Sequence, residues 1–133
     1  MTTSRWGLVA GLLAASLVRP GAAAAQTATV GDSVTERAAR GRLLFEGKGL
    51  CFSCHGKAGE GMLGPTTRLA GRPLVHTKPT LAAIAELIKS GVDSAHSTSG
   101  QVMPARGGSR LSDSDVDAVA QYVLELETRK KPE

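Results

Sequence analysis

Two thiols and one imidazole stand close together in this sequence of 133 residues, as Cys51, Cys54 and His55. Two cysteines separated by two residues can form thioether bonds to the two vinyl groups of one porphyrin, and the adjacent imidazole can then bind the iron from one face. The chain has no other cysteine. The spacing therefore predicts one covalent haem c, attached through Cys51 and Cys54, with His55 as a ligand of the iron.

Other chemistry is available to two cysteines at this spacing. A thioredoxin-like redox pair would need a preceding strand and a βαβ pattern, and neither is visible. A structural zinc site would need a fourth ligand, which His76 or His96 could supply. A plain disulfide is a third possibility in an oxidising compartment. Haem attachment is favoured because the whole five-residue pattern is present and because the rest of the chain fits it.

The first 25 residues have the pattern of an export signal. Arg5 gives a basic start, an apolar run follows from Trp6 to Val18, and Ala23 and Ala25 form a small-x-small cleavage site. We expect cleavage after Ala25 and a periplasmic protein without a membrane span in its mature form; the alternatives are an uncleaved anchor and a core helix. Cleavage removes two arginines and lowers the formal net charge from +4 to +2, and no nucleic-acid partner is expected.

The composition indicates a core that needs a large apolar group. Aromatic residues are 3% of the chain, and its single tryptophan lies within the predicted signal. The aromatic residues left in the mature chain are Phe45, Phe52 and Tyr122, which is a thin supply for a domain of this size. A haem would fill the centre of such a fold.

Helix caps and hydrophobic periodicity predict three helices and no strands. Ser33 and Glu36 form a capping box, and the helix that they open ends at Gly47. Thr80 caps a helix over residues 81–89, and Ser112 caps the last helix. The expected buried faces are Val34, Ala38, Gly41 and Phe45; Leu81, Ile84, Leu87 and Ile88; and Val116, Val119, Ala120, Val123 and Leu126.

The intervening segments, 47–79 and 91–110, are rich in Gly, Pro, Ser and Thr. Loops of this length in a small domain are typical of a wrap around a functional site. We therefore expect a flexible lead over 26–32, one domain over 33–128 and a short tail over 129–133.

At this point the chain resembles the class I cytochrome c family. The resemblance spans about residues 34–127 and is carried by the haem-attachment pattern, by Gly64-Pro65, by Met103-Pro104 and by Leu111-Ser112-Asp113. It implies an all-α cytochrome c fold, with three main helices and long loops wrapped around one covalent haem.

The resemblance also implies roles for single residues. Met103 matches the loop methionine that binds iron on the face away from His55, and a thioether paired with an imidazole raises the reduction potential. His96 and Met62 are the alternative ligands. Pro65 matches the proline whose carbonyl accepts a hydrogen bond from the proximal imidazole, which would fix the ring and its tautomer.

Two further contacts are expected around the haem. The family brings its first and last helices together at a glycine and aromatic contact, to which Gly41, Phe45 and Tyr122 correspond. Arg72, and less surely Arg68, could pair with a haem propionate, since arginine binds carboxylates in bidentate fashion. The mature chain lacks the tryptophan that binds a propionate in many larger members, which suggests a short, bacterial type.

Six-coordinate iron leaves no position for a substrate, so we predict an electron carrier rather than an enzyme, with redox proteins as donor and acceptor. It would act as a diffusing monomer or as the haem c subunit of a periplasmic oxidoreductase complex. A charged ring around the haem edge would favour the first, and an apolar patch the second. An open-site haem enzyme or sensor is a third possibility, which requires that Met103 is not a ligand.

Overall fold

The computed structural model describes residues 33–129, and the predicted signal segment, flexible lead and most of the tail lie outside that range. In chain order the elements are the helices α1 (Val34–Glu46) and α2 (Phe52–His55), the 3-10 turn η1 (Pro65–Thr67), α3 (Leu81–Ser90), the 3-10 turn η2 (Ala105–Gly108) and α4 (Asp113–Thr128). The all-α class and the three main helices are confirmed. Over residues 33–129 the extended pairing is limited to an isolated antiparallel bridge between Val92 and Met103.

The three main helices begin where their caps predict. The Ser33 hydroxyl accepts from the Glu36 N–H while the Glu36 carboxylate accepts from the Ser33 N–H, which completes the capping box. Thr80 caps α3 through the Ala83 N–H. The Ser112 hydroxyl caps α4 by accepting the Asp115 N–H, and the Asp115 carboxylate accepts the Ser112 N–H. Each cap satisfies N–H groups that have no partner within the helix.

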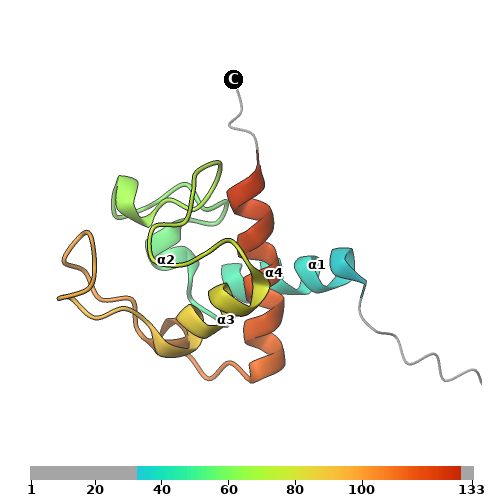
Figure 1. Cartoon of the computed structure of the whole chain (residues 1–133). Helices are drawn as coiled ribbons and strands as arrows, with labels where there is room; N and C mark the ends of the chain where they lie inside the picture. Colours follow the sequence, from blue (N-terminus) through green and yellow to red (C-terminus); the bar gives the residue numbers. More distant parts are fainter. Residues whose placement is uncertain (1–32, 130–133) are drawn as a thin grey trace, which may run out of the picture.

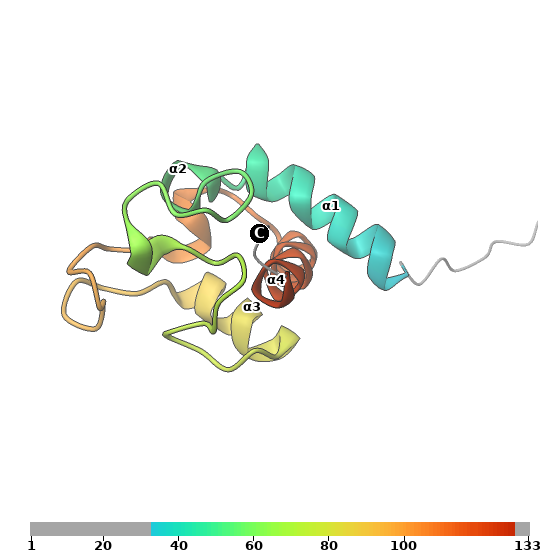
Figure 2. The ribbon, with the colours of Figure 1, turned by 90° about the horizontal axis from the view of Figure 1, so that it is seen from above.

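Helix α4 is the centre of the packing. Both α1 and α3 pack against it, and Figure 2 shows α4 nearly end-on between them. All five residues of its predicted stripe are buried, as are Ile84 and Ile88 of α3. Figure 1 shows α1 crossing α4 steeply, with α2 and the long loops gathered on one side of the helices.

Gly41 makes the crossing of α1 and α4 possible. A Cβ added at Gly41 would lie 1.9 Å from the Ala118 carbonyl oxygen and 3.0 Å from the Tyr122 Cβ. The Phe45 and Tyr122 rings meet edge to face, with their centroids 5.3 Å apart. The predicted contact of Gly41, Phe45 and Tyr122 is therefore present. Such close backbone approach excludes any larger residue at position 41.

One predicted core position is wrong. Val34 shares the helical face of Ala38, Gly41 and Phe45, but its side chain is 61% exposed while those three are buried. The physical reason is the length of α1, whose first turn extends past its crossing with α4 (Figure 2). Periodicity identifies a helix face but does not say where the partner helix ends.

Candidate functional site

The two cysteines and His55 lie around the four-residue helix α2, directly after α1. Leu50 has a φ of 56°, a left-handed conformation that side-chain-bearing residues seldom adopt. This turn directs the chain from α1 into α2, and the His55 N–H then donates to the Cys51 carbonyl over 3.0 Å. The pattern that the sequence places within five residues is thus folded into one helical turn, with Cys51, Cys54 and His55 all partly buried.

The His55 imidazole is held by a single backbone carbonyl. Its Nδ1 lies 2.6 Å from the Thr67 oxygen, so Nδ1 carries the proton and Nε2 is left available for a metal. Burial lowers the pKa of His55, which keeps the ring neutral, although the bond to Thr67 acts in the opposite direction. A neutral imidazole is the form that binds iron.

The prediction that the Pro65 carbonyl accepts the hydrogen bond of this imidazole is wrong, because the Thr67 carbonyl does so. Pro65 opens η1, and its carbonyl accepts the N–H of Arg68 that closes the turn, as well as the Arg72 guanidinium. The turn brings the carbonyl of Thr67 to His55 instead. The orienting contact exists as expected, but it comes two residues later in the chain.

Thr67 is itself fixed on both sides. Its side chain is buried, and its hydroxyl donates to the Gly64 carbonyl over 2.9 Å while accepting the Leu63 N–H over 3.3 Å. Such support restricts the motion of the carbonyl that orients His55. Nothing in the residue type of Thr67 signals this role in the sequence, because it depends on the path of the loop.

Two adjoining cavities lie beside the cysteines and His55. The first has a volume of about 130 Å³ and opens toward the loop 92–103, and the second has a volume of about 90 Å³ and lies against α3 and α4. Cys51, His55 and Met103 line both of them. The second is bounded mainly by apolar side chains: Phe45, Leu69, Leu74, Ile84, Leu87, Ile88, Val119 and Val123. The helices and loops thus surround an apolar space in contact with the predicted attachment residues.

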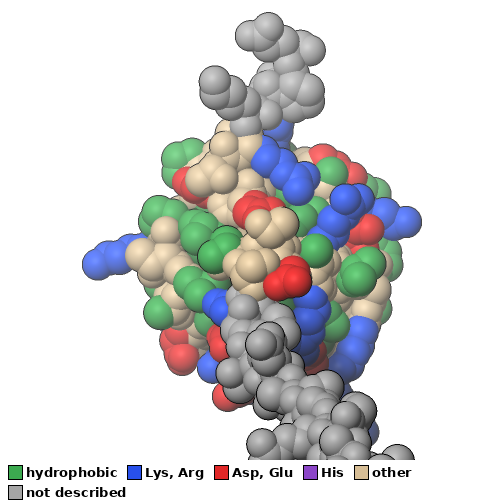
Figure 3. All heavy atoms as spheres, turned by 90° about the vertical axis from the view of Figure 1, so that its right-hand side faces the viewer, with side chains coloured by type: hydrophobic (Ala, Val, Ile, Leu, Met, Phe, Trp, Pro, Cys, Tyr) green, Lys and Arg blue, Asp and Glu red, His purple; other side chains and the backbone are tan. Residues whose placement is uncertain are grey.

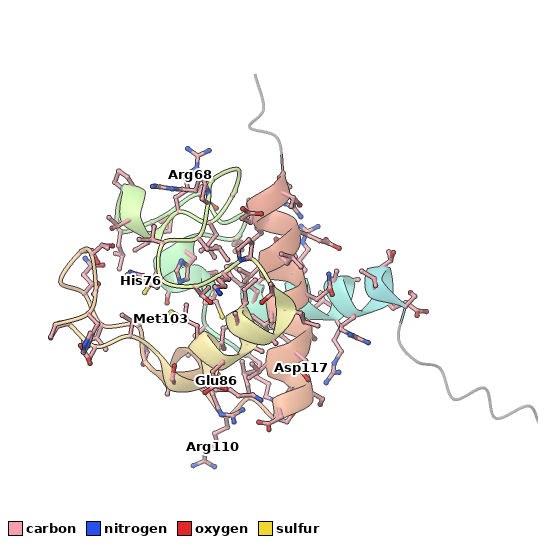
Figure 4. All side chains as sticks on the ribbon, viewed as in Figure 1. Arg68, His76, Glu86, Met103, Arg110 and Asp117 are labelled. Carbon is pink, nitrogen blue, oxygen red and sulfur yellow. The ribbon has the colours of Figure 1, made fainter. Side chains whose placement is uncertain are left out.

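Met103 is brought to these cavities by the isolated bridge. Its N–H donates to the Val92 carbonyl and its carbonyl accepts the Val92 N–H, both over 2.8 Å. Gly91 permits this approach, because a Cβ there would lie 2.4 Å from the Met103 oxygen. Figure 4 shows the Met103 side chain in the space between α2, α3 and the loops. A thioether is thereby fixed in the same cavities as the His55 imidazole.

The alternative ligands lie elsewhere. Met62 is 64% exposed, and neither it nor His96 lines either large cavity. His96 is exposed and pairs through Nδ1 with Asp93 at 2.8 Å. His76, which the sequence suggests only as a zinc ligand, lies at the mouth of the cavities, with its Nε2 3.4 Å from the Thr98 hydroxyl (Figure 4).

The two arginines considered as partners of a haem propionate differ in their position relative to the cavities. Arg72 is bound to the Pro65 carbonyl and lines a shallow hollow outside both cavities, so the structure does not place it at the predicted site. Arg68 lines the second cavity, and its Nε donates to the Ala70 carbonyl over 3.0 Å. Of the two, Arg68 is the one that borders the cavity space.

The alternatives for the cysteines gain no support. Both thiols are free, and residues 33–129 hold no group of three or more histidine, cysteine or acidic side chains arranged for a metal ion. Burial raises the pKa of the Cys51 thiol to about 11.

These residues fit a covalent haem. Two thiols, a neutral imidazole with one nitrogen already bonded and a thioether are gathered around an apolar space. Glycines allow this crowding, since a Cβ at Gly107 would lie 2.4 Å from the Gly49 oxygen and 3.7 Å from the Cys51 sulfur. Cys51 and Cys54 would hold the haem, and His55 and Met103 have the chemistry of its axial ligands.

The position of Asp115 in the first turn of the last helix predicts only a favourable interaction with the helix dipole, and the structure gives it a larger role. Its buried carboxylate pairs with Arg40 of α1 at 2.6 Å and with Lys48 at 3.1 Å. The Ser112 backbone N–H first, and then Lys48, hold its pKa well below the usual range. Asp115 joins α1, the loop before α2 and the start of α4. The signal in the sequence was its place as third residue of a capping box.

Comparison with protein families gives a match over most of the domain. The model of a family described as cytochrome c oxidase, cbb3-type, subunit III matches residues 36–123. No curated protein and no solved structure matches the chain. In residues 33–129, no helix has the length and apolar character to cross a membrane.

Proposed function

Since the chain belongs to this cytochrome c family and carries one covalent haem c, we propose that it transfers single electrons in the periplasm through iron bound by His55 and Met103. Haem-based electron transfer is the chemistry of the family. The identity of the two iron ligands and the periplasmic location go beyond what the family match implies. The observation that carries it is the presence of His55 and Met103 in the lining of the same two cavities.

Each chain component has a defined task in this function. Cys51 and Cys54 hold the haem through thioether bonds, so it cannot dissociate. The bound haem supplies a reversible Fe(II)/Fe(III) couple, and a His/Met ligand pair favours the reduced state. The Thr67 carbonyl fixes the His55 ring, and the Val92 bridge fixes Met103. The guanidinium of Arg68 is the candidate partner of a propionate on the inner side.

With both His55 and Met103 bound to it, the iron would have no site left for a substrate. The chain therefore acts as an electron carrier. Periplasmic location follows from the export pattern of residues 1–25 and from the need of such proteins for haem attachment outside the cytoplasm. Redox proteins are the expected donor and acceptor.

A second assignment within the same chemistry has an observation in its favour. The matched family is described as a subunit of a cbb3-type cytochrome c oxidase. By similarity, this chain would be the haem c subunit of a periplasmic oxidoreductase complex and would accept electrons from a catalytic subunit. Co-purification of a tagged chain with a stoichiometric redox partner would support this assignment over a free carrier.

The axial ligand is tested by Met103→Ala, with Met62→Ala as the matched control. We expect wild type and Met62→Ala to show the far-red methionine-to-iron band in the ferric state and Met103→Ala to lose it. Loss of the thioether should lower the reduction potential by roughly 0.2 V, part of the range of about 0.8 V that axial ligands span. An unchanged band in Met103→Ala would exclude Met103. Absence of covalent haem in the wild type, after expression with attachment machinery, would overturn the whole proposal.

A further inference from the structure

The mouth of the first cavity carries no fixed charge. Charged residues are 21% of the chain, yet no Lys, Arg, Asp or Glu lines this cavity. Its exposed lining consists of apolar, hydroxyl and amide side chains together with His76. We call the following six residues the neutral rim: Leu50, Ser53, Thr66, Thr98, Gln101 and Val102.

Three charged residues that flank segments of the rim contact groups that do not line the cavity: Lys48, Asp93 and Arg106. Lys48, which precedes Leu50 by two positions, pairs with Asp115 at 3.1 Å. Arg106 follows the Met103 segment and donates to the Leu111 carbonyl at 2.8 Å and to Asp113 at 2.7 Å. Asp93, next to Val92, pairs with His96. These contacts direct the side chains of Lys48 and Arg106 to groups outside the rim.

The opposite side of the molecule differs. Figure 3 shows basic and acidic side chains scattered over the face that includes α1. On that helix Arg42 pairs with Glu46 at 2.7 Å, and Arg40 reaches Asp115. The face that includes α1 therefore carries charged side chains, whereas no Lys, Arg, Asp or Glu lines the first cavity.

We propose that the neutral rim is the docking surface for a redox protein whose own contact surface is uncharged. This inference rests on the proposed function, because electron transfer requires close approach to the haem. Leu50 and Val102 are 49% and 58% exposed and provide the apolar contact. A charged group at the centre of the partner surface would lose hydration and find no opposite charge here. Charge complementarity therefore selects a neutral partner.

Such a surface has a kinetic consequence. Long-range attraction between opposite charges raises association rates and makes them fall with ionic strength. A neutral rim provides neither effect, so encounters are unsteered and depend little on salt. This suits a partner kept nearby by other contacts, as in a subunit complex, better than a search by diffusion.

The protein itself can serve as the probe. In electron self-exchange, a ferrous and a ferric copy meet through the haem edge, so the rim of one faces the rim of the other. NMR line broadening in mixtures of the two oxidation states measures the rate. Measurements at ionic strengths of about 0.01 M and 1 M compare Debye lengths of about 30 Å and 3 Å. We expect the wild-type rate to change less than about threefold between them.

Variants of equal net charge locate the contact. Val102→Glu places two like charges face to face and should slow self-exchange by roughly fivefold or more at about 0.01 M, but little at 1 M. Leu43→Glu changes the net charge equally, yet Leu43 lies on α1, is 74% exposed and does not line the cavity. It should leave the rate nearly unchanged. Cross-exchange between Val102→Glu and Val102→Lys should be faster than either self-exchange at low salt.

The outcomes separate the two proposals. Equal slowing by Val102→Glu and Leu43→Glu would show that the rim is not the contact surface. A wild-type rate that changes more than about tenfold with salt would show that the face is charged. Failure of the wild type to cycle between ferrous and ferric states overturns the proposed function, and the docking proposal falls with it.

Discussion

The crossing of α1 with α4 and the loops around His55 and Met103 are built by different means. At the crossing, side chains hold the helices together: Phe45 and Tyr122 are at most 2% exposed, and their rings pack edge to face. Around the site, backbone groups position the side chains: the Thr67 carbonyl holds His55, and two backbone hydrogen bonds to Val92 hold Met103. The first region is a closed core, whereas the second encloses space.

The difference shows how a chain so poor in aromatic residues folds. Its first and last helices make one close contact through Gly41, Phe45 and Tyr122, and this contact fixes where α2 and the loops begin. The loops leave an apolar space, which we propose that the covalent haem fills. Stability should therefore be most sensitive to changes at the crossing, and the spectrum and potential to changes in the loops.

The largest expected effect is that of Gly41→Ala at the crossing. An exposed helical glycine gains up to about 1 kcal/mol on replacement by alanine, but here the added Cβ would lie 1.9 Å from the Ala118 oxygen. The helices must separate, so we expect a loss of about 3 kcal/mol in the free energy of unfolding. Denaturant titration followed by far-ultraviolet circular dichroism measures it.

Ala39→Gly is the matched control, because Ala39 is an exposed residue of the same helix. It should lose only about 1 kcal/mol. Equal stability of Gly41→Ala and wild type would show that α1 and α4 do not meet this closely, and the comparison between the two regions would lose its basis.

The next effect concerns the ion pairs that join the two regions. The pKa of Asp115 is depressed in the folded state, chiefly by the Ser112 N–H and by Lys48. Such a group stabilises the fold above its unfolded pKa of about 3.9 and loses that contribution as the pH falls toward its lower folded value. Asp115→Asn should therefore lower stability by about 1–2 kcal/mol at pH 7.

The same variant should show a weaker dependence of stability on pH below about pH 4, measured by denaturant titration at several pH values. Asp117→Asn, on the exposed side of α4, is the control and should match wild type within about 0.5 kcal/mol. If Asp115→Asn retained the full acid sensitivity of the wild type, another carboxylate would be responsible.

The sequence predicted the local features of this fold and missed the long-range ones. Caps at Ser33, Thr80 and Ser112 and the stripe of α4 were predictable because each depends on residues within a few positions. The exposure of Val34 was not predictable, since it depends on where α4 lies. The family resemblance supplied the crossing at Gly41, which periodicity alone would have judged unfavourable.

The same division applies to the site. The attachment residues follow from spacing alone, because a haem needs Cys51, Cys54 and His55 in one turn. The carbonyl that orients His55 was assigned to Pro65, and the structure gives it to Thr67, because the turn η1 uses the Pro65 oxygen itself. The link from Asp115 to Arg40 and Lys48 also joins distant parts of the chain. Spacing cannot show such contacts.

A smaller effect is expected from the support of His55 by Thr67. Thr67→Val keeps the shape but removes the hydroxyl bonds to Gly64 and Leu63, and we expect a loss of about 1 kcal/mol. The carbonyl remains, so the iron should stay six-coordinate and the far-red band should persist. Denaturation and optical spectra test both parts. Loss of the band would mean that the hydroxyl, rather than the carbonyl alone, keeps the ring in place.

The smallest effect would decide between the two arginines. Arg68 lines the inner cavity and Arg72 does not. If Arg68 pairs with a propionate, Arg68→Gln removes a positive charge close to the haem, favours the ferric state and lowers the reduction potential by roughly 20–60 mV. Arg72→Gln removes the same charge at greater separation, where solvent screens it, and should shift the potential by less than about 10 mV.

Cyclic voltammetry of both variants at one ionic strength makes the comparison, and each serves as the control for the other. Equal shifts would mean that only net charge matters, and a larger shift for Arg72→Gln would return the propionate to the arginine that the sequence favoured. A shift confined to Arg68→Gln would place a propionate on the inner side of the cavity. The neutral rim would then remain uncharged in the loaded protein, which ties the potential and the docking surface to the same orientation of the haem.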